Sequence, residues 1–161
     1  MSITAARSYL SERGYADKVQ EFSVSSATVA LAAEALHCEP ARIAKTLAFL
    51  VGEENILIVA AGDIRIDNAR YKAQFHSKAK MIPIEELNDR VGHEIGGVCP
   101  FGIREGVKVY LDESLKRFHT VFPACGSANS AIELTIPELE QLSGYLAWID
   151  VGKGWREGET E

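Results

Sequence analysis

The chain has 161 residues, of which 47% are hydrophobic and 25% are charged, and its formal net charge is −6. This length is typical of one domain, and the composition excludes a chain that is disordered throughout. No apolar run approaches the ~20 residues that cross a bilayer, and residues 1–7 lack the pattern of a signal peptide, so we expect a cytoplasmic protein with no membrane contact.

The first half of the chain alternates helical and strand patterns. Apolar spacing and cap residues predict a helix from residue 3 to Gly14, a strand at 19–22, a helix over 29–36 capped by Ser25 or Ser26, and a helical turn after Pro40. Two apolar runs at 47–51 and 56–61, with a polar turn between them, predict a hairpin of strands that are buried on both faces. Asp67 is expected to cap a helix that ends at Phe75.

The second half is richer in strand patterns. We expect a helix over 83–91, strands at 107–111, 120–122 and 132–136, a last helix from Pro137, and a closing strand at 148–151. Several connections are too short for crossover helices, so the order predicts one mixed α/β domain over residues 1–151 with a largely antiparallel sheet. The glycine-rich, acidic residues 152–161 are expected to form a loose tail.

The cysteines and the charge distribution narrow the classes of function. Cys38, Cys99 and Cys125 are odd in number and widely separated, which argues against a disulfide framework and against a zinc site. The four histidines show no metal-ligand spacing either. Residues 42–80 hold seven Lys or Arg and four Asp or Glu, a net charge of +3. That segment could meet a phosphate backbone, or its lysines could simply form a solvated face.

Lys45 stands at the start of an otherwise apolar strand pattern. Its side chain either extends to solvent or presents its ammonium to a pocket, where it would hold a phosphate or carbonyl oxygen. Composition and spacing alone leave both alternatives open.

A glycine- and proline-rich loop occupies residues 96–102. Glycine lets the backbone approach a ligand and point N–H groups at one oxygen, and Pro100 would fix the loop's shape. A tight turn between strands is the alternative. Cys99 in this loop could pair with His93 as a nucleophile, although free cysteines are more often inert packing.

A second small polar loop, residues 124–130, contains Gly126, Ser127 and Asn129. Its hydroxyl and amide groups could line a cleft, or the segment could be only a turn.

Together these features resemble a known family. Residues 28–36, then Pro40, then the run from Ile43 to Leu47 resemble the YbaK/EbsC family, the editing domain associated with prolyl-tRNA synthetase. The stretch from Gly96 to Pro100 is similar to that family's GxxxP loop, and Gly126 to the glycine of its later polar loop. The resemblance covers residues 3–150.

The resemblance implies a freestanding aminoacyl-tRNA deacylase with a curved, mostly antiparallel sheet flanked by helices. Lys45 would hold the terminal aminoacyl nucleotide, and backbone N–H groups of Gly96, Gly97, Val98 and Cys99 would stabilise the carbonyl oxygen. The attack would come from the tRNA's ribose hydroxyl or from a water, with no cofactor and no metal ion. Other positions of these motifs would contact the substrate: Thr28, Val29, Thr46, Phe49, Pro100, Gly126, Ser127 and Asn129.

Thr28, Val29 and Phe49 would sort amino acids by size. Residues 126–130 lack a histidine found in alanine-clearing relatives, so the resemblance does not identify alanine as the substrate. The acidic net charge favours weak tRNA binding, or delivery through a synthetase or elongation factor. Two alternatives remain: a Cys99-dependent hydrolase, and a non-catalytic module that binds tRNA or a synthetase.

Overall fold

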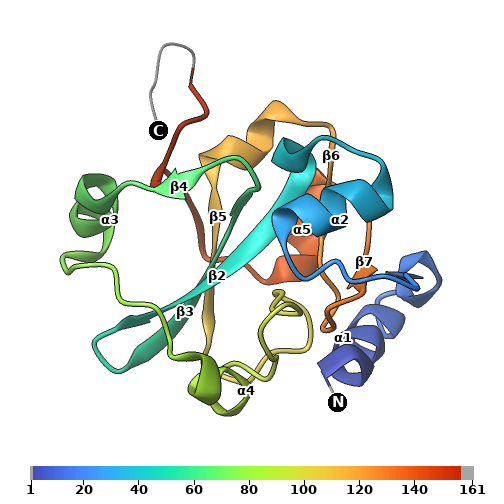
Figure 1. The fold of residues 1–161 in the computed structure, drawn as a ribbon. Coiled ribbons are helices and arrows are strands. Elements are labelled where there is room, and N and C mark those ends of the chain that lie inside the picture. The colour runs from blue at the N-terminus through green and yellow to red at the C-terminus, as the bar shows by residue number, and fades with distance from the viewer. Residues whose placement is uncertain (1, 157–161) are drawn as a thin grey trace.

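The computed structural model describes residues 2–156, which form one mixed α/β domain around a six-stranded sheet (Figure 1). None of the helices within these residues has the length and apolarity that a membrane span requires. The strands follow one another across the sheet in the order β8-β6-β2-β3-β5-β9. Their bounds are β2 Ile43–Val51, β3 Glu54–Ala61, β5 Lys108–Asp112, β6 Thr120–Pro123, β8 Leu134–Thr135 and β9 Ala147–Ile149.

Parallel and antiparallel pairs are mixed in this sheet. The pairs β2–β3 and β6–β8 are antiparallel, whereas β2–β6, β3–β5 and β5–β9 are parallel. The predicted mixed α/β class is therefore confirmed, but the expectation of a mostly antiparallel sheet is wrong. Parallel neighbours need long connections, and the chain between β3 and β5 provides one that contains two helices.

The hairpin of β2 and β3 lies at the centre of the sheet, as the two apolar runs predicted. Side chains alternate between its faces: Ile56 and Ile58 join one buried cluster, and Leu57 and Val59 join the other. β2 begins at Ile43, before the apolar run, so Lys45 and Thr46 lie inside the strand.

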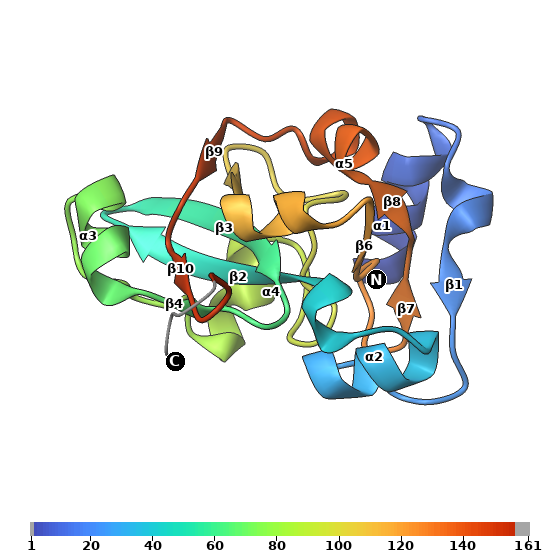
Figure 2. The ribbon, with the colours of Figure 1, turned by 90° about the horizontal axis from the view of Figure 1, so that it is seen from above.

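Helices cover both faces of the sheet (Figures 1 and 2). On one face, α3 places Tyr71 against Phe49, with ring centroids 5.1 Å apart. On the other face, α1 and α5 contribute Leu10 and Leu139 to the larger cluster. The helices are α1 Ser2–Ser11, α2 Val29–Leu36, α3 Asn68–Phe75, α4 Leu87–Arg90 and α5 Ile136–Ser143. The 3-10 helices of the described residues are η1 Ala16–Lys18, η2 Pro40–Arg42, η3 Ile84–Glu86 and η4 Glu113–Arg117.

Capping explains where α2 and α3 begin. Asp67 caps α3 as predicted, because its carboxylate accepts a hydrogen bond from the Arg70 amide at 3.1 Å. The cap predicted for α2 is wrong: Thr28, not Ser25 or Ser26, accepts from the Leu31 amide at 3.2 Å. Thr28 has the extended backbone that a cap residue needs, whereas the serines precede it by two or three residues.

Short strands tie the remaining segments to the domain. Of the predicted strand at 132–136, only β8 at 134–135 forms, because Ile136 already begins α5; β7 Ser130–Ala131 precedes the predicted range. β7 pairs with β1 Gln20–Glu21. In the expected tail, β10 Gly152–Lys153 pairs with β4 Arg65–Ile66, and residues 157–161 lie outside the described residues.

Candidate functional site

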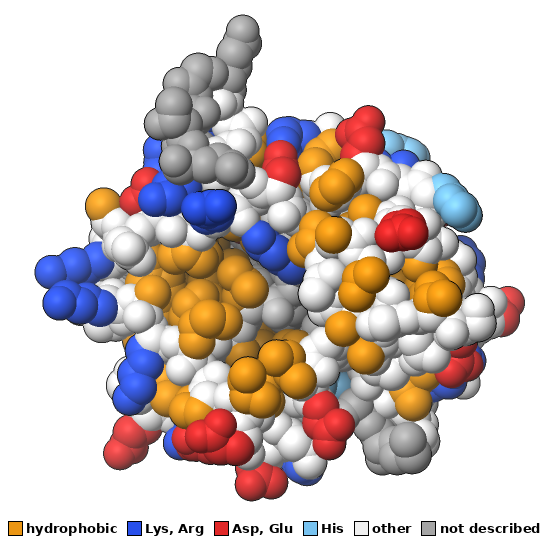
Figure 3. Space-filling model, viewed as in Figure 1, with side chains coloured by type: hydrophobic (Ala, Val, Ile, Leu, Met, Phe, Trp, Pro, Cys, Tyr) orange, Lys and Arg blue, Asp and Glu red, His pale blue; other side chains and the backbone are white. Residues whose placement is uncertain are grey.

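A cavity of about 530 Å³ opens beside β2. Its walls are mostly apolar and come from β2, the start of α2, residues 81–87 and the loop at 95–98. We call it the β2 cavity. Figure 3 shows the face that carries the hollow, with hydrophobic side chains inside it and Lys and Arg side chains at its border.

The β2 cavity lies at a gap in the pairing of β2. On this side β6 pairs only with Ile43 and Ala44. Farther along, residues 80–82 take over, with hydrogen bonds from the Leu50 amide to the Lys80 carbonyl at 2.8 Å and from the Ile82 amide to the Ala48 carbonyl at 3.0 Å. On this side of β2, which is opposite to β3, no described residue is paired with the strand between these two contacts.

Thr46 lies within this gap. Because backbone groups alternate along a strand, its N–H and C=O point to the same side as those of Ala48 and Leu50, toward the cavity. Its Oγ1 is also buried and has no hydrogen-bond partner among the described residues. Buried polar groups without partners are costly, so three polar groups of one residue are placed to bind a ligand.

Lys45 also lines the cavity, and its ammonium is anchored. Nζ donates hydrogen bonds to the carbonyl oxygens of Gly62, at 3.5 Å, and of Ile64. A side chain on Gly62 would place its Cβ only 2.1 Å from the Pro40 carbonyl oxygen, so only glycine lets the backbone at residue 62 lie this close to Pro40. The result is a compact cation held beside an apolar cavity.

The glycine loop reaches the cavity from the opposite side. Gly96 and Val98 line it, and their N–H groups donate to no other described residue. Gly96 has φ +89°, a conformation that glycine adopts without strain. The Gly97 amide, by contrast, donates to the Glu94 carbonyl at 3.0 Å, so it stabilises the turn rather than facing a ligand.

Gly97 instead connects the two loops that the sequence singled out. A Cβ on Gly97 would lie 2.5 Å from the Gly126 carbonyl carbon and from the Ser127 nitrogen. The two backbones therefore touch, and only glycine allows it. The position of the 96–98 segment thus depends on the later loop.

Cys99 faces the interior and is fully buried. Burial raises the pKa of its thiol to about 12, so the nucleophilic thiolate is scarce at neutral pH. His93 Nε2 lies 3.5 Å from the sulfur but donates to the Phe101 carbonyl at 2.6 Å. A nitrogen that carries this hydrogen cannot take the thiol proton, so the pair is not arranged for nucleophilic catalysis.

The structure separates the other predicted site residues into two groups. Thr28 and Val29, at the start of α2, line the β2 cavity. Phe49 does not, because it faces α3 in the opposite cluster. Pro100 belongs to the glycine loop and is buried. The Asn129 amide donates to the Phe22 carbonyl at 2.9 Å and so supports its own turn.

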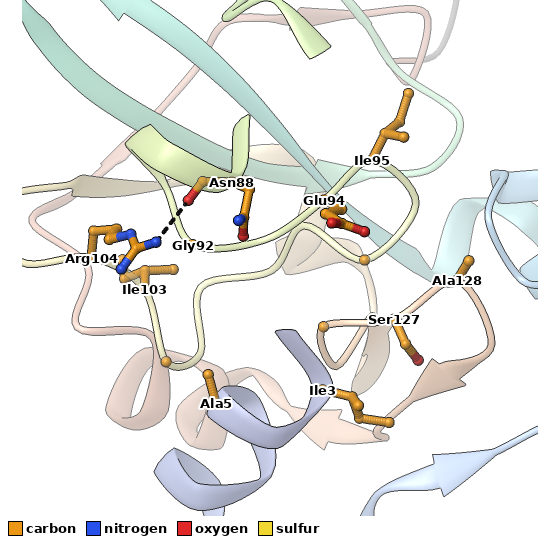
Figure 4. A pocket seen from close by; sticks show the side chains of 13 residues that line it. Ile3, Ala5, Asn88, Gly92, Glu94, Ile95, Ile103, Arg104, Ser127 and Ala128 are labelled. Atoms are coloured by element: carbon orange, nitrogen blue, oxygen red, sulfur yellow. Dashed lines mark hydrogen bonds between the residues drawn. The ribbon is translucent and has the colours of Figure 1, made fainter. Parts of the chain in front are cut away.

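Gly126 and Ser127 line a second cavity of about 570 Å³, which α1 borders (Figure 4). Arg104 and Asn88 stand at one end of it, where the guanidinium donates to the Asn88 carbonyl at 3.2 Å (Figure 4). The loop between Gly92 and Gly102 separates this cavity from the β2 cavity. Across the described residues, no group of three or more His, Cys, Asp or Glu side chains could hold a metal ion.

Sequence reasoning missed the apolar rim of the β2 cavity. Met81, Ile84 and Ile95 line it although they are 57%, 60% and 61% exposed. Large apolar side chains exposed together indicate a contact surface. Helical periodicity puts Ile84 on one side of the expected helix with Leu87 and Val91, and nothing in this local pattern distinguishes a rim residue from a core residue.

Known proteins resemble the chain over most of its length. Residues 24–142 match the family model described as the aminoacyl-tRNA editing domain. The chain is 52% identical over 156 residues to the uncharacterised protein YwhH of Bacillus subtilis (strain 168), covering 96% of this chain and 99% of that protein. It is 27% identical over 95 residues to a proline–tRNA ligase of Bacillus cytotoxicus, covering 58% of this chain and 16% of the ligase. A crystal structure described as a candidate trans-editing enzyme for prolyl-tRNA synthetase has a TM-score of 0.85 at 29% identity, covering 95% of this chain and 98% of that one.

Proposed function

The chain belongs to the aminoacyl-tRNA editing domain family, and we propose that it hydrolyses the ester of mischarged aminoacyl-tRNA in trans. The observation that carries the proposal is the β2 cavity. All of its lining residues lie within the matched residues 24–142, and it joins an apolar interior to the anchored cation of Lys45. An aminoacyl-adenosine has the same two parts, an apolar or small side chain and a polar, phosphate-linked end.

The substrate would enter with its amino-acid side chain against the apolar walls. The Lys45 ammonium would hold oxygen atoms of the terminal aminoacyl nucleotide. The N–H groups of Gly96 and Val98, which donate to no described residue, would stabilise the ester carbonyl oxygen as negative charge develops on it. The backbone N–H and C=O of Thr46 would fix the substrate along the open edge of β2.

The reaction then needs no protein nucleophile, because an aminoacyl ester is already activated. A water positioned by the free ribose hydroxyl attacks the carbonyl carbon, the ester C–O bond to the ribose breaks, and the ribose oxygen takes up a proton. The products are the free amino acid and the uncharged tRNA. The burial of Cys99 argues against the alternative in which that thiol attacks.

The size of the cavity would decide which amino acids are removed. An apolar pocket distinguishes one methylene group by only ~1–3 kcal/mol, so it excludes large side chains more sharply than it distinguishes small ones. Substrates are therefore expected among tRNAs charged with small amino acids. The match to part of a proline–tRNA ligase supports a relation to synthetases, with tRNAPro as the first tRNA to test.

The test is deacylation of tRNAs mischarged with Ala, Ser, Thr or Cys, with wild type and Lys45→Ala compared directly. Turnover is expected for the wild type and should be lost in the variant, while the thermal midpoint of unfolding of the variant stays close to that of the wild type. Lys116→Ala is the matched control, since Lys116 pairs with Glu113 away from the cavity. Equal turnover by Lys45→Ala and wild type would refute the role of Lys45. Binding without turnover on every member would favour a non-catalytic module.

A further inference from the structure

Most Lys and Arg side chains of the described residues lie within 4.0 Å of a carboxylate. Six other cations of residues 2–156 have no carboxylate within this distance: Arg65, Lys72, Lys78, Lys80, Arg104 and Lys153. All of these except Arg104 belong to β4, β10, α3 or the segment after α3. In a protein of net charge −6, this is an uneven distribution of uncompensated positive charge.

Two of these cations oppose each other directly. In the antiparallel pair β4–β10, Arg65 is the register partner of Lys153. Like charges at such positions repel, because the side chains leave the same face with Cβ atoms only ~5 Å apart. The site is also close to the β2 cavity, since the neighbouring residue Ile64 provides the carbonyl that binds Lys45. An anion bound between the two side chains would remove the repulsion.

The lysines after α3 precede the rim of the same cavity in the chain. Lys78 and Lys80 are exposed, whereas Ala79 between them packs against the buried cluster that contains Tyr71 of α3. Lys80 directly precedes Met81, a residue of the cavity rim, and its carbonyl is bonded to β2. Lys72 is exposed on α3 itself. Figure 3 shows Lys and Arg side chains along the left and upper borders of the hollowed face.

We propose that Arg65, Lys72, Lys78, Lys80 and Lys153, which we call the basic flank, bind the phosphates of the tRNA acceptor end whose 3′ terminus enters the β2 cavity. The inference rests on the proposed function. These cations extend from β10 to the segment before Met81, which is too wide a spread for one small anion. A polynucleotide backbone, by contrast, carries a series of phosphates that could contact them together. The carboxylates elsewhere on the protein would repel that backbone and orient it.

The test compares two triple variants that remove the same charge. One carries Lys72→Gln, Lys78→Gln and Lys80→Gln, and the control carries Arg13→Gln, Lys18→Gln and Lys116→Gln. The control cations have carboxylate partners, and they lie just after α1, on η1 and on η4, away from α3 (Figure 1). Binding of uncharged tRNA is measured by fluorescence anisotropy between about 50 and 200 mM salt.

Each phosphate contact adds ~0.7–0.9 to the slope of log affinity against log salt, so a fourfold rise in salt weakens binding about threefold per contact. The flank variant should therefore lose about 2–3 units of slope, while the control keeps the wild-type slope. Equal slopes in the flank variant and the wild type, equal losses in both triple variants, or no binding of tRNA by the wild type would each overturn the proposal.

A second readout separates this proposal from the proposed function. Deacylation of full-length mischarged tRNA is compared with that of an aminoacylated CCA trinucleotide, and the advantage of the full-length substrate should fall in the flank variant. If the wild type deacylates neither substrate but its tRNA binding still depends on the basic flank, the proposed function is refuted and the proposed tRNA-binding surface is supported. If both substrates are deacylated and the ratio of their deacylation rates is unchanged in the flank variant, the tRNA-binding surface is refuted and the proposed function is supported.

Discussion

Replacing Gly97 by alanine tests whether the contact between the two loops sets the shape of the site. The new Cβ would lie 2.5 Å from the Gly126 carbonyl carbon and from the Ser127 nitrogen, and 2.8 Å from the Gly126 oxygen. Non-bonded carbon atoms pack at ~3.5–4.0 Å, so the backbones must separate by about 1 Å. A displacement of that size at a reacting centre costs about 100-fold in rate, and overpacking costs about 1–3 kcal/mol of stability.

The assay is kcat/KM for deacylation of the best mischarged tRNA, with unfolding in urea measured on the same samples. Gly106→Ala is the control: Gly106 has φ +89° and nothing within 4 Å of a built Cβ. Backbone strain should cost it about 1–2 kcal/mol, a loss of stability similar to that of Gly97→Ala, while kcat/KM is kept. Wild-type kcat/KM in Gly97→Ala would refute the argument that this contact positions the 96–98 segment.

Two further predictions concern the buried pair behind the loop. Cys99→Ala should keep kcat/KM within about threefold. Iodoacetamide should not inactivate the wild type at about pH 8, because with a pKa of about 12 only about one Cys99 thiol in 10⁴ is ionised at that pH. Rapid inactivation of the wild type that Cys99→Ala abolishes would contradict this prediction. Burial lowers the pKa of His93 below its ordinary value of about 6.5, so the unfolded state binds more protons and stability is lost as pH falls below about 6.5. Unfolding free energy between about pH 7.5 and 5.5 should therefore fall more steeply in wild type than in His93→Gln, and parallel curves would contradict the prediction.

Elements specified by neighbouring residues could be predicted from the sequence. The central hairpin follows from two apolar runs around a short polar turn. The start of α3 follows from one carboxylate that accepts from the Arg70 amide. At α5, Thr135 and Glu138 form a capping box, and the helix began within one residue of the proline that marked it. In each case the information lies within a few residues of the element.

Features that depend on distant parts of the chain could not be predicted in this way. The parallel pairing of β3 with β5 depends on how the chain between them crosses the sheet. The β2 cavity depends on where β6 stops pairing and where residues 80–82 begin, so no local pattern shows that Thr46 lies in a gap. The resemblance predicts Phe49 in the site, but Phe49 faces α3 with Tyr71, outside the β2 cavity.

The basic segment shows how the structure resolves an ambiguity that composition leaves open. Its net charge of +3 could belong to solvated helix faces or to a binding surface. In the folded chain Arg42 meets Glu133, and Arg70 meets Asp150, so these two cations are compensated by residues far away in sequence. Lys78 and Lys80 find no such partner among the described residues, and Lys80 directly precedes Met81 of the cavity rim. The folded state thus concentrates uncompensated charge next to the cavity, where an acidic protein can still attract one end of a polyanion.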